Sequence, residues 1–291
     1  MNCRMAVTAA LLGALFGCAA PAADKGGEAS SAFAFAAAQQ APDAAAVRRQ
    51  LQRLLPADIL LMGEQHDAPS HQQLQRTVVQ LLAEQGMLAA VALEMAEQGT
   101  STAGLPANAS EQQVREALKW RENSWPWANY GPVVMEAVRA NILVLGANLP
   151  PAEIRNAMQS VALDGHLAKA LWQEQQKNMY EGHCGLLPER QIVPMARVQL
   201  ARDAAMARTV LAARQNGKTV LLIAGNGHVD RKLGVPTHLG RDVRASVLVL
   251  VPVPAPGAAG SSPPADAVWM TPTLPKKDYC AELKAPAAPA R

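Results

Sequence analysis

The stretch Ile59-Leu60-Leu61-Met62-Gly63-Glu64-Gln65-His66 places a Gly-x-x-His tetrapeptide directly after a short apolar run. The same arrangement returns far along the chain, where Val220-Leu221-Leu222-Ile223-Ala224 precedes Gly225-Asn226-Gly227-His228. Short apolar runs of this kind are typical of strands buried in a parallel sheet. Both histidines are therefore expected just past a strand end, where side chains line the ligand crevice of open α/β sheets.

A third apolar run, Ala90-Val91-Ala92-Leu93, ends in Glu94 and adds a carboxylate at the same kind of position. Taken singly, Glu64, His66, Glu94 and His228 are best interpreted as buried polar groups that pair in tight turns. Taken together they predict a functional crevice, because burying two carboxylates and two imidazoles costs free energy unless a ligand or a function compensates.

Apolar runs alternate with longer helical patterns, which predicts an α/β fold with a largely parallel or mixed central sheet flanked by helices on both faces. The expected strands are 58–62, 90–94, 142–145, 220–224 and 246–251. Helix starts are expected at Ser70 and at Ser110, which forms a capping-box pattern with Gln113. Pro132 and Pro151 suit the first turn of a helix.

The helix expected from about Pro194 to Gln215 carries polar residues within its apolar stripe. Gln199, Arg202 and Asp203 stand among methionines and alanines, as on a helix that lines a polar pocket. A structural interpretation stays open, since Arg202 and Asp203 can also pair with neighbours or face solvent.

The ends of the chain indicate export. Residues 1–17 are typical of a signal peptide, and Leu15-Phe16-Gly17-Cys18 resembles a lipobox, which implies lipid attachment at Cys18. Ordinary secretion is the alternative. We expect a flexible stalk over 18–46, an α/β domain over 47–252 and a Pro/Ala-rich tail over 253–291. Ala19 after the cysteine favours the outer membrane, facing the periplasm.

Two cysteines remain once Cys3 and Cys18 are accounted for. In an oxidising compartment Cys184 and Cys280 predict a disulfide that ties the tail to the domain. The alternative is that Cys184 acts as a soft metal or haem ligand beside His183. The net charge of +3, without a basic stripe interleaved with aromatics, gives no indication of nucleic-acid binding.

An ordered set of motifs over roughly residues 55–250 resembles the ChaN family of haem-binding lipoproteins, within a superfamily similar to TraB/PrgY, Tiki and the erythromycin esterases. The matching motifs are Gly63-Glu64-Gln65-His66-Asp67, Leu93-Glu94-Met95, Tyr130-Gly131-Pro132, Gly146-Ala147-Asn148, His183-Cys184, Gln199-x-x-Arg202-Asp203-x-x-Met206-Ala207, Ala224-Gly225-Asn226-Gly227-His228 and Gly234-Val235-Pro236.

The resemblance implies a membrane-tethered protein for iron and haem acquisition. It implies a homodimer with two haems stacked face to face, a tyrosine ligand to the iron, and an outer-membrane haem receptor as a candidate partner. A phenolate ligand favours ferric haem. Of the three tyrosines, Tyr279 lies in the tail, so we choose Tyr180 as the ligand, with His183 assisting and Tyr130 as the alternative.

The resemblance to Tiki and the erythromycin esterases leaves a second function open. Glu64, His66, Glu94 and His228 suit a divalent metal such as Zn, Mn or Co, or general acid–base hydrolysis of an ester or peptide. A serine nucleophile is not expected, because the sequence has no Gly-x-Ser-x-Gly elbow. We attach no function to His71, His166 and His238, which we expect at the surface or at helix caps.

Overall fold

The structure, a computed structural model, describes residues 42–254 and 264–284. The expected signal peptide, Cys18 and nearly all of the expected stalk lie outside these residues. Within the described ranges, no helix combines the length and apolar character needed to cross a membrane.

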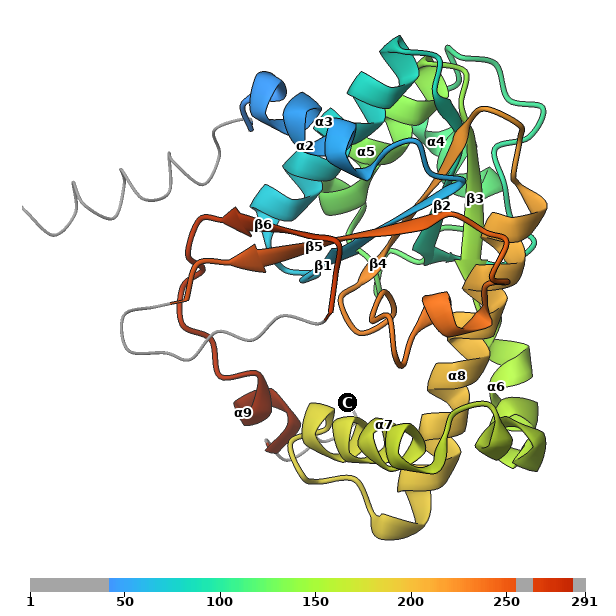
Figure 1. The fold of residues 1–291 in the computed structure, drawn as a ribbon, viewed down its shortest axis with the longest axis vertical. Helices are drawn as coiled ribbons and strands as arrows, with labels where there is room; N and C mark the ends of the chain where they lie inside the picture. Colours follow the sequence, from blue (N-terminus) through green and yellow to red (C-terminus); the bar gives the residue numbers. More distant parts are fainter. Residues whose placement is uncertain (1–41, 255–263, 285–291) are drawn as a thin grey trace, which may run out of the picture. The chain divides into compact units, whose positions relative to one another are not determined.

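The described chain forms a six-stranded sheet whose neighbouring strands all pair in parallel (Figure 1). The strands are β1 (Ile59–Glu64), β2 (Leu88–Glu97), β3 (Leu143–Asn148), β4 (Thr219–Gly225), β5 (Ala245–Pro252) and β6 (Ala267–Thr271). Their order across the sheet is β3-β2-β4-β1-β5-β6. The predicted α/β class is confirmed, and each of the five expected strands overlaps an observed one.

Helices cover both faces of this sheet. Those on the first face are α2 (Ala44–Leu54), α3 (Pro69–Glu84), α4 (Glu111–Ala117) and α5 (Trp127–Arg139). The others are α6 (Pro151–Gln159), α7 (Lys169–Gly182), α8 (Glu189–Ala212) and α9 (Tyr279–Lys284), with short 3-10 helices at Val161–Gly165 and Val235–His238. Of these, α8 supplies most of the cover on the second face.

Two apolar cores form because successive side chains of a strand point to opposite faces. In β1, Leu60 and Met62 join the core under α2, α3 and α5. Ile59 and Leu61 face the other way and pack with Met206 of α8. All six residues of β1 are buried, which accounts for the continuous apolar run in its sequence.

Some expected helix starts are correct and others are wrong. Ser110 and Gln113 form the predicted capping box, and Pro151 begins α6. Pro132 instead lies inside α5, because Pro126 already stands at the start of that helix.

Two further helices, α8 and α3, begin earlier in the chain than expected. Pro188 precedes α8 and leaves Pro194 within it, so the helix begins earlier than expected. Ser70 does not cap α3, since Pro69 is the first helical residue and the Ser70 hydroxyl has no hydrogen-bond partner among the described residues. A proline permits a helix start but does not fix it.

The C-terminal segment is more integrated than the expected tail. β6 pairs with β5, and Trp269 packs against the first core. His71, expected at the surface, is fully buried: its Nδ1 accepts from the Gln65 backbone N–H at 2.9 Å, and its Nε2 lies 2.9 Å from the Thr271 hydroxyl of β6. Proline and alanine around β6 obscured a short strand that only its pairing with β5 reveals.

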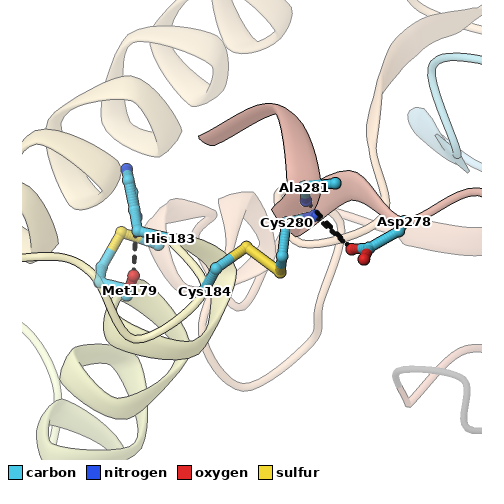
Figure 2. The surroundings of a disulfide bond; sticks show 6 residues. All are labelled: Met179, His183, Cys184, Asp278, Cys280 and Ala281. Atoms are coloured by element: carbon cyan, nitrogen blue, oxygen red, sulfur yellow. Dashed lines mark hydrogen bonds between the residues drawn. A yellow bond between two sulfur atoms is a disulfide. The ribbon is translucent and has the colours of Figure 1, made fainter. Parts of the chain in front are cut away.

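A disulfide joins Cys184, just after α7, to Cys280 in α9 (Figure 2). Asp278 accepts hydrogen bonds from the backbone N–H groups of Cys280 and Ala281, at 2.9 and 3.1 Å, and so caps α9. With its sulfur in a disulfide, Cys184 has no thiolate to offer to a metal or to haem.

Replacing Gly63 with alanine is expected to destabilise the fold, because a Cβ at this position would collide with the side chains of Val229 and Asn226. Overpacking of this kind typically costs about 1–3 kcal/mol of unfolding free energy. Urea denaturation followed by circular dichroism measures the change. The matched control is Gly182→Ala at the end of α7, where a Cβ meets nothing within 4 Å. Equal stability of the two variants would contradict close packing between β1 and the turn after β4.

Candidate functional site

The carboxyl ends of three adjacent strands meet at one edge of the sheet. β4 lies between β1 and β2. This order brings together Glu64, the last residue of β1, His66 just after it, Glu94 in β2 and His228 after β4. The Nε2 atoms of His66 and His228 lie 3.7 and 3.5 Å from the two oxygens of Glu94. The four residues predicted to form a crevice are therefore neighbours. We call Glu64, His66, Glu94 and His228 the crevice residues, or the crevice.

Glu64 is held by four side chains. Its Oε1 accepts hydrogen bonds from the Tyr130 hydroxyl at 2.7 Å and from His66 Nδ1 at 2.8 Å. Its Oε2 accepts from the amides of Gln72 and Gln75 on α3. Each carboxylate oxygen therefore has two donors. A carboxylate bound in this way stays fixed and orients the imidazole attached to it.

His66 is only partly buried. Its side chain is 38% exposed, and its ring meets Trp125 edge-on with centroids 4.8 Å apart. Burial lowers the pKa of His66, but the hydrogen bond to Glu64 and the charge of Glu94 outweigh it and raise the pKa. At 3.7 Å from Glu94, Nε2 makes no hydrogen bond within the described residues.

His228 is enclosed between two carboxylates. Its Nδ1 lies 2.6 Å from Asp203 of α8, and the Gln199 amide nitrogen lies 3.2 Å from the same atom. Burial lowers the pKa of His228, whereas the charges of Glu94 and Asp203 together raise it to about 10. Burial raises the pKa of Asp203 to about 6.

Glu94 connects the two imidazoles. Its Oε2 accepts the Gly225 backbone N–H at 2.7 Å. Although burial raises the pKa of this carboxyl, the neighbouring His228, followed by His66, lowers it to about 2. The crevice thus holds a permanent carboxylate between two imidazoles that are protonated more readily than free histidine.

The ligand set for a metal is less complete than its residue types suggest. No group of three or more His, Cys, Asp or Glu side chains in the described ranges is arranged to hold a metal ion. Both Nδ1 atoms of the crevice histidines are already engaged, with Glu64 and with Asp203. The geometry shows a hydrogen-bonded proton network.

The predicted haem residues lie in two different environments. Tyr180 and His183 stand at the end of α7, where the Tyr180 side chain is exposed. Tyr130 is almost completely buried, and its hydroxyl belongs to the crevice through Glu64, a carboxylate that together with burial raises the hydroxyl pKa. The phenol of Tyr130 is therefore a structural donor, and this environment disfavours it as an iron ligand.

Three contributors to the site were not foreseen. Gln72 and Gln75 are buried on α3, and Trp125 borders His66. A signal for the glutamines existed: they are polar residues one turn apart on the helix face that also carries Leu74 and Val78. The position of Trp125 had no such signal, because it depends on how the loop before α5 folds.

Comparison with protein families finds a match to the family described as "Haem-binding uptake, Tiki superfamily, ChaN" over residues 50–239, more than half of the chain. The chain belongs to this family. The expected family resemblance is thereby confirmed, and the family's haem-binding description applies to the domain that carries the crevice.

One solved structure shares the fold of this chain. ChaN of Campylobacter jejuni, described as showing cofacial heme binding, shares 24% identity over 73% of this chain and 87% of that chain, with a TM-score of 0.60. The type III effector HopBA1 gives a TM-score of 0.40 at 17% identity, over 75% of this chain and 88% of its own. A Bacillus cereus protein gives a TM-score of 0.42 at 13% identity, over 72% of this chain and 69% of its own. Comparison with curated proteins gives no match.

The His228 ring is expected to titrate near pH 10, because Glu94 and Asp203 stabilise its proton. The folded chain then binds this proton more tightly than the unfolded chain. The resulting stability is complete below pH 6.5 and is lost as the pH rises through about 10. NMR titration of the imidazole signals measures the pKa of His228 directly.

Glu94→Gln should lower the pKa of His228 by removing one of the two charges. The His71 signal is an internal control, since burial lowers its pKa to about 4 independently of Glu94. A His228 pKa near that of free histidine in the wild type would disprove the assigned proton network.

Proposed function

We propose that this protein binds ferric haem through the phenolate of Tyr180, at a face shared by two copies of the chain, and serves haem or iron uptake. Family membership supports haem as the ligand. The observation that carries the choice of residue is the exposure of Tyr180, 43%, in a segment that also exposes Leu186, 49%.

The residues at the end of α7 fit a haem. Haem offers a large apolar face and an iron that accepts a phenolate. The first half of α7 packs through Leu171 and Trp172 against an apolar cluster that includes Leu200 of α8. Within α7, described in full, only Gln175 is buried, so the half that carries Tyr180 keeps an open surface.

His183 is suited to assist. Its Nδ1 contacts the Met179 carbonyl at 2.7 Å, which fixes the ring against the helix end (Figure 2). Because Nδ1 donates to this carbonyl, Nε2 carries the lone pair; it makes no hydrogen bond to a described residue and can accept one from a ligand or bind the iron. The disulfide from Cys184 to Cys280 holds this segment in place next to α9.

Two further parts of the proposal have narrower support. The homodimer is supported by the description of the Campylobacter jejuni relative as binding cofacial heme, which needs two haem sites facing each other. Tethering to a membrane is supported by Leu15-Phe16-Gly17-Cys18, and the choice of the outer membrane, facing the periplasm, by Ala19. An outer-membrane haem receptor remains the partner we expect for transfer.

Tyr180→Phe is expected to abolish the phenolate-to-iron charge-transfer band of the ferric complex and to weaken haem binding at least about tenfold, because the iron loses its anionic ligand. Absorption titration of the purified protein with ferric haem measures both effects, and sizing chromatography of the complex tests dimer formation.

Tyr279→Phe is the matched control, since Tyr279 is also exposed but its hydroxyl is engaged with Asp67 and Gln65. An unchanged spectrum for Tyr180→Phe would refute the ligand assignment. A complex that remains monomeric would refute the shared face.

One observation favours hydrolysis as a second candidate function. Glu64 binds Nδ1 of His66 at 2.8 Å, while Nε2, 3.7 Å from Glu94, has no hydrogen-bond partner within the described residues; this is the arrangement of an oriented general base. In this scheme Nε2 takes a proton from an attacking water, and Glu64 stabilises the imidazolium that forms. Protonated His228 beside Glu94 adds a positive charge to the crevice.

His66→Gln is then expected to lower kcat/KM for hydrolysis of p-nitrophenyl acetate about 10²- to 10⁴-fold, the range for loss of a general base. His166→Gln should leave the rate unchanged, because His166 is exposed and contacts His238 and Thr237 outside the crevice. Release of p-nitrophenol is the readout, with and without added Zn or Mn. A rate that does not depend on His66 under either condition would eliminate this function.

A further inference from the structure

A cavity of about 290 Å³ lies beside the crevice. It is bounded by the carboxyl end of β2, the end of β3, the start of α6, the loop before α5 and α8. Glu94 lines the cavity and is also one of the four crevice residues, so the cavity reaches the crevice. Ligand pockets generally measure about 300–1,000 Å³, so this cavity suits a molecule much smaller than haem.

Two guanidinium groups line the cavity. Arg202 comes from α8, and its Nε is buried without a hydrogen-bond partner in the part of the chain that the structure describes. Arg121 comes from the loop before α5 and contacts Glu97 through a single nitrogen at 3.2 Å. Among the described residues Arg202 donates no hydrogen bond and Arg121 donates one, so most of their donors are available to a ligand.

The carboxylates of the cavity do not satisfy Arg202. Glu97 binds Arg121, and Glu94 is committed to His228 and to the Gly225 backbone N–H. Asp203, next in the chain, is fully buried and contacts His228 instead. The charge of Arg202 therefore has no hydrogen-bonded carboxylate among the described residues of the cavity.

The other residues that line the cavity indicate what the uncharged part of a ligand would contact. Trp125, Leu149 and Ile154 give an apolar surface on which a flat or aliphatic group can lie. The Asn148 side-chain oxygen is buried without a partner among the described residues and can accept a hydrogen bond from a ligand hydroxyl or amine. Buried polar atoms left unpaired are rare unless water or a ligand binds them.

We propose that this cavity binds a small organic anion, with a carboxylate or phosphate group held by Arg202 and Arg121 and an apolar body against Trp125. A planar guanidinium binds both kinds of oxyanion in a bidentate manner. This binding site is separate from the haem residues on α7.

The same site also indicates a substrate class for the second candidate function, hydrolysis. This one inference depends on that function, whereas anion binding does not. Trp125 touches both the cavity and the ring of His66, so an anion bound to Arg202 places the remainder of its molecule toward Nε2 of His66. The natural substrate class of the crevice is then an ester or amide that carries an acidic group.

Isothermal titration calorimetry of the purified protein with benzoate and phenyl phosphate tests the binding site without haem and without turnover. Benzamide has the shape of benzoate but no charge and is the neutral control. Benzoate or phenyl phosphate should bind at least about tenfold more tightly than benzamide, and the stronger of the two identifies the oxyanion.

Arg202→Gln should weaken binding of the preferred anion about tenfold or more, and Arg121→Gln about threefold, since Arg121 is already shared with Glu97. Arg208→Gln is the matched control on the same helix, because Arg208 points to Gln98 and does not line this cavity. Arg121 is largely exposed, so its variant keeps the test valid if Arg202→Gln fails to fold.

Equal affinity for benzoate and benzamide, or equal weakening by Arg208→Gln and Arg202→Gln, would overturn the proposed anion site. Failure of hydrolysis with intact anion binding would overturn only the proposed substrate class. Loss of haem binding in Tyr180→Phe has no bearing on this measurement.

Discussion

The insertion of β4 between β1 and β2 is the constraint on which the site depends. Parallel pairing aligns the carboxyl ends of these three strands, so residues separated by more than 160 positions reach the same edge of the sheet. The close approach needs glycine. A Cβ on Gly63 would strike the turn after β4, and a Cβ on Gly225 would lie 2.9 Å from Nε2 of His66. The glycine of each Gly-x-x-His tetrapeptide thus makes room for residues of the other.

Charge balance then decides what the crevice can do. Two imidazoles and three acidic groups are buried or half-buried together, and each charge has a partner of opposite sign. His228 lies between two carboxylates and is held protonated, while His66 has one ring nitrogen fixed and the other open. The same residue type therefore has two roles, one structural and electrostatic and one available for proton transfer or ligand contact.

The end of α7, where we propose that haem binds, and the crevice are distinct but connected through a disulfide and hydrogen bonds. The disulfide joins the loop after α7 to α9, and in α9 the Tyr279 hydroxyl accepts from Gln65 and donates to Asp67, on either side of His66. The C-terminal segment also reaches the crevice loop through Thr271 and His71. Residues that sequence analysis placed in a loose tail hold the loop that presents His66.

The sequence by itself determined the α/β class, five of the strands and the identity of the crevice residues, because apolar runs followed by Gly-x-x-His or Glu are local patterns that report burial and strand ends directly. It also supplied Arg202 as a candidate from the helix pattern around it, and Tyr180 through the family resemblance, which implies a tyrosine ligand. Only the tertiary structure decided the rest: that β6 joins the sheet, that Tyr130 and His71 are buried and that Arg202 faces a cavity. Each of these depends on contacts between segments far apart in the chain, for which no local pattern of residues gives a signal.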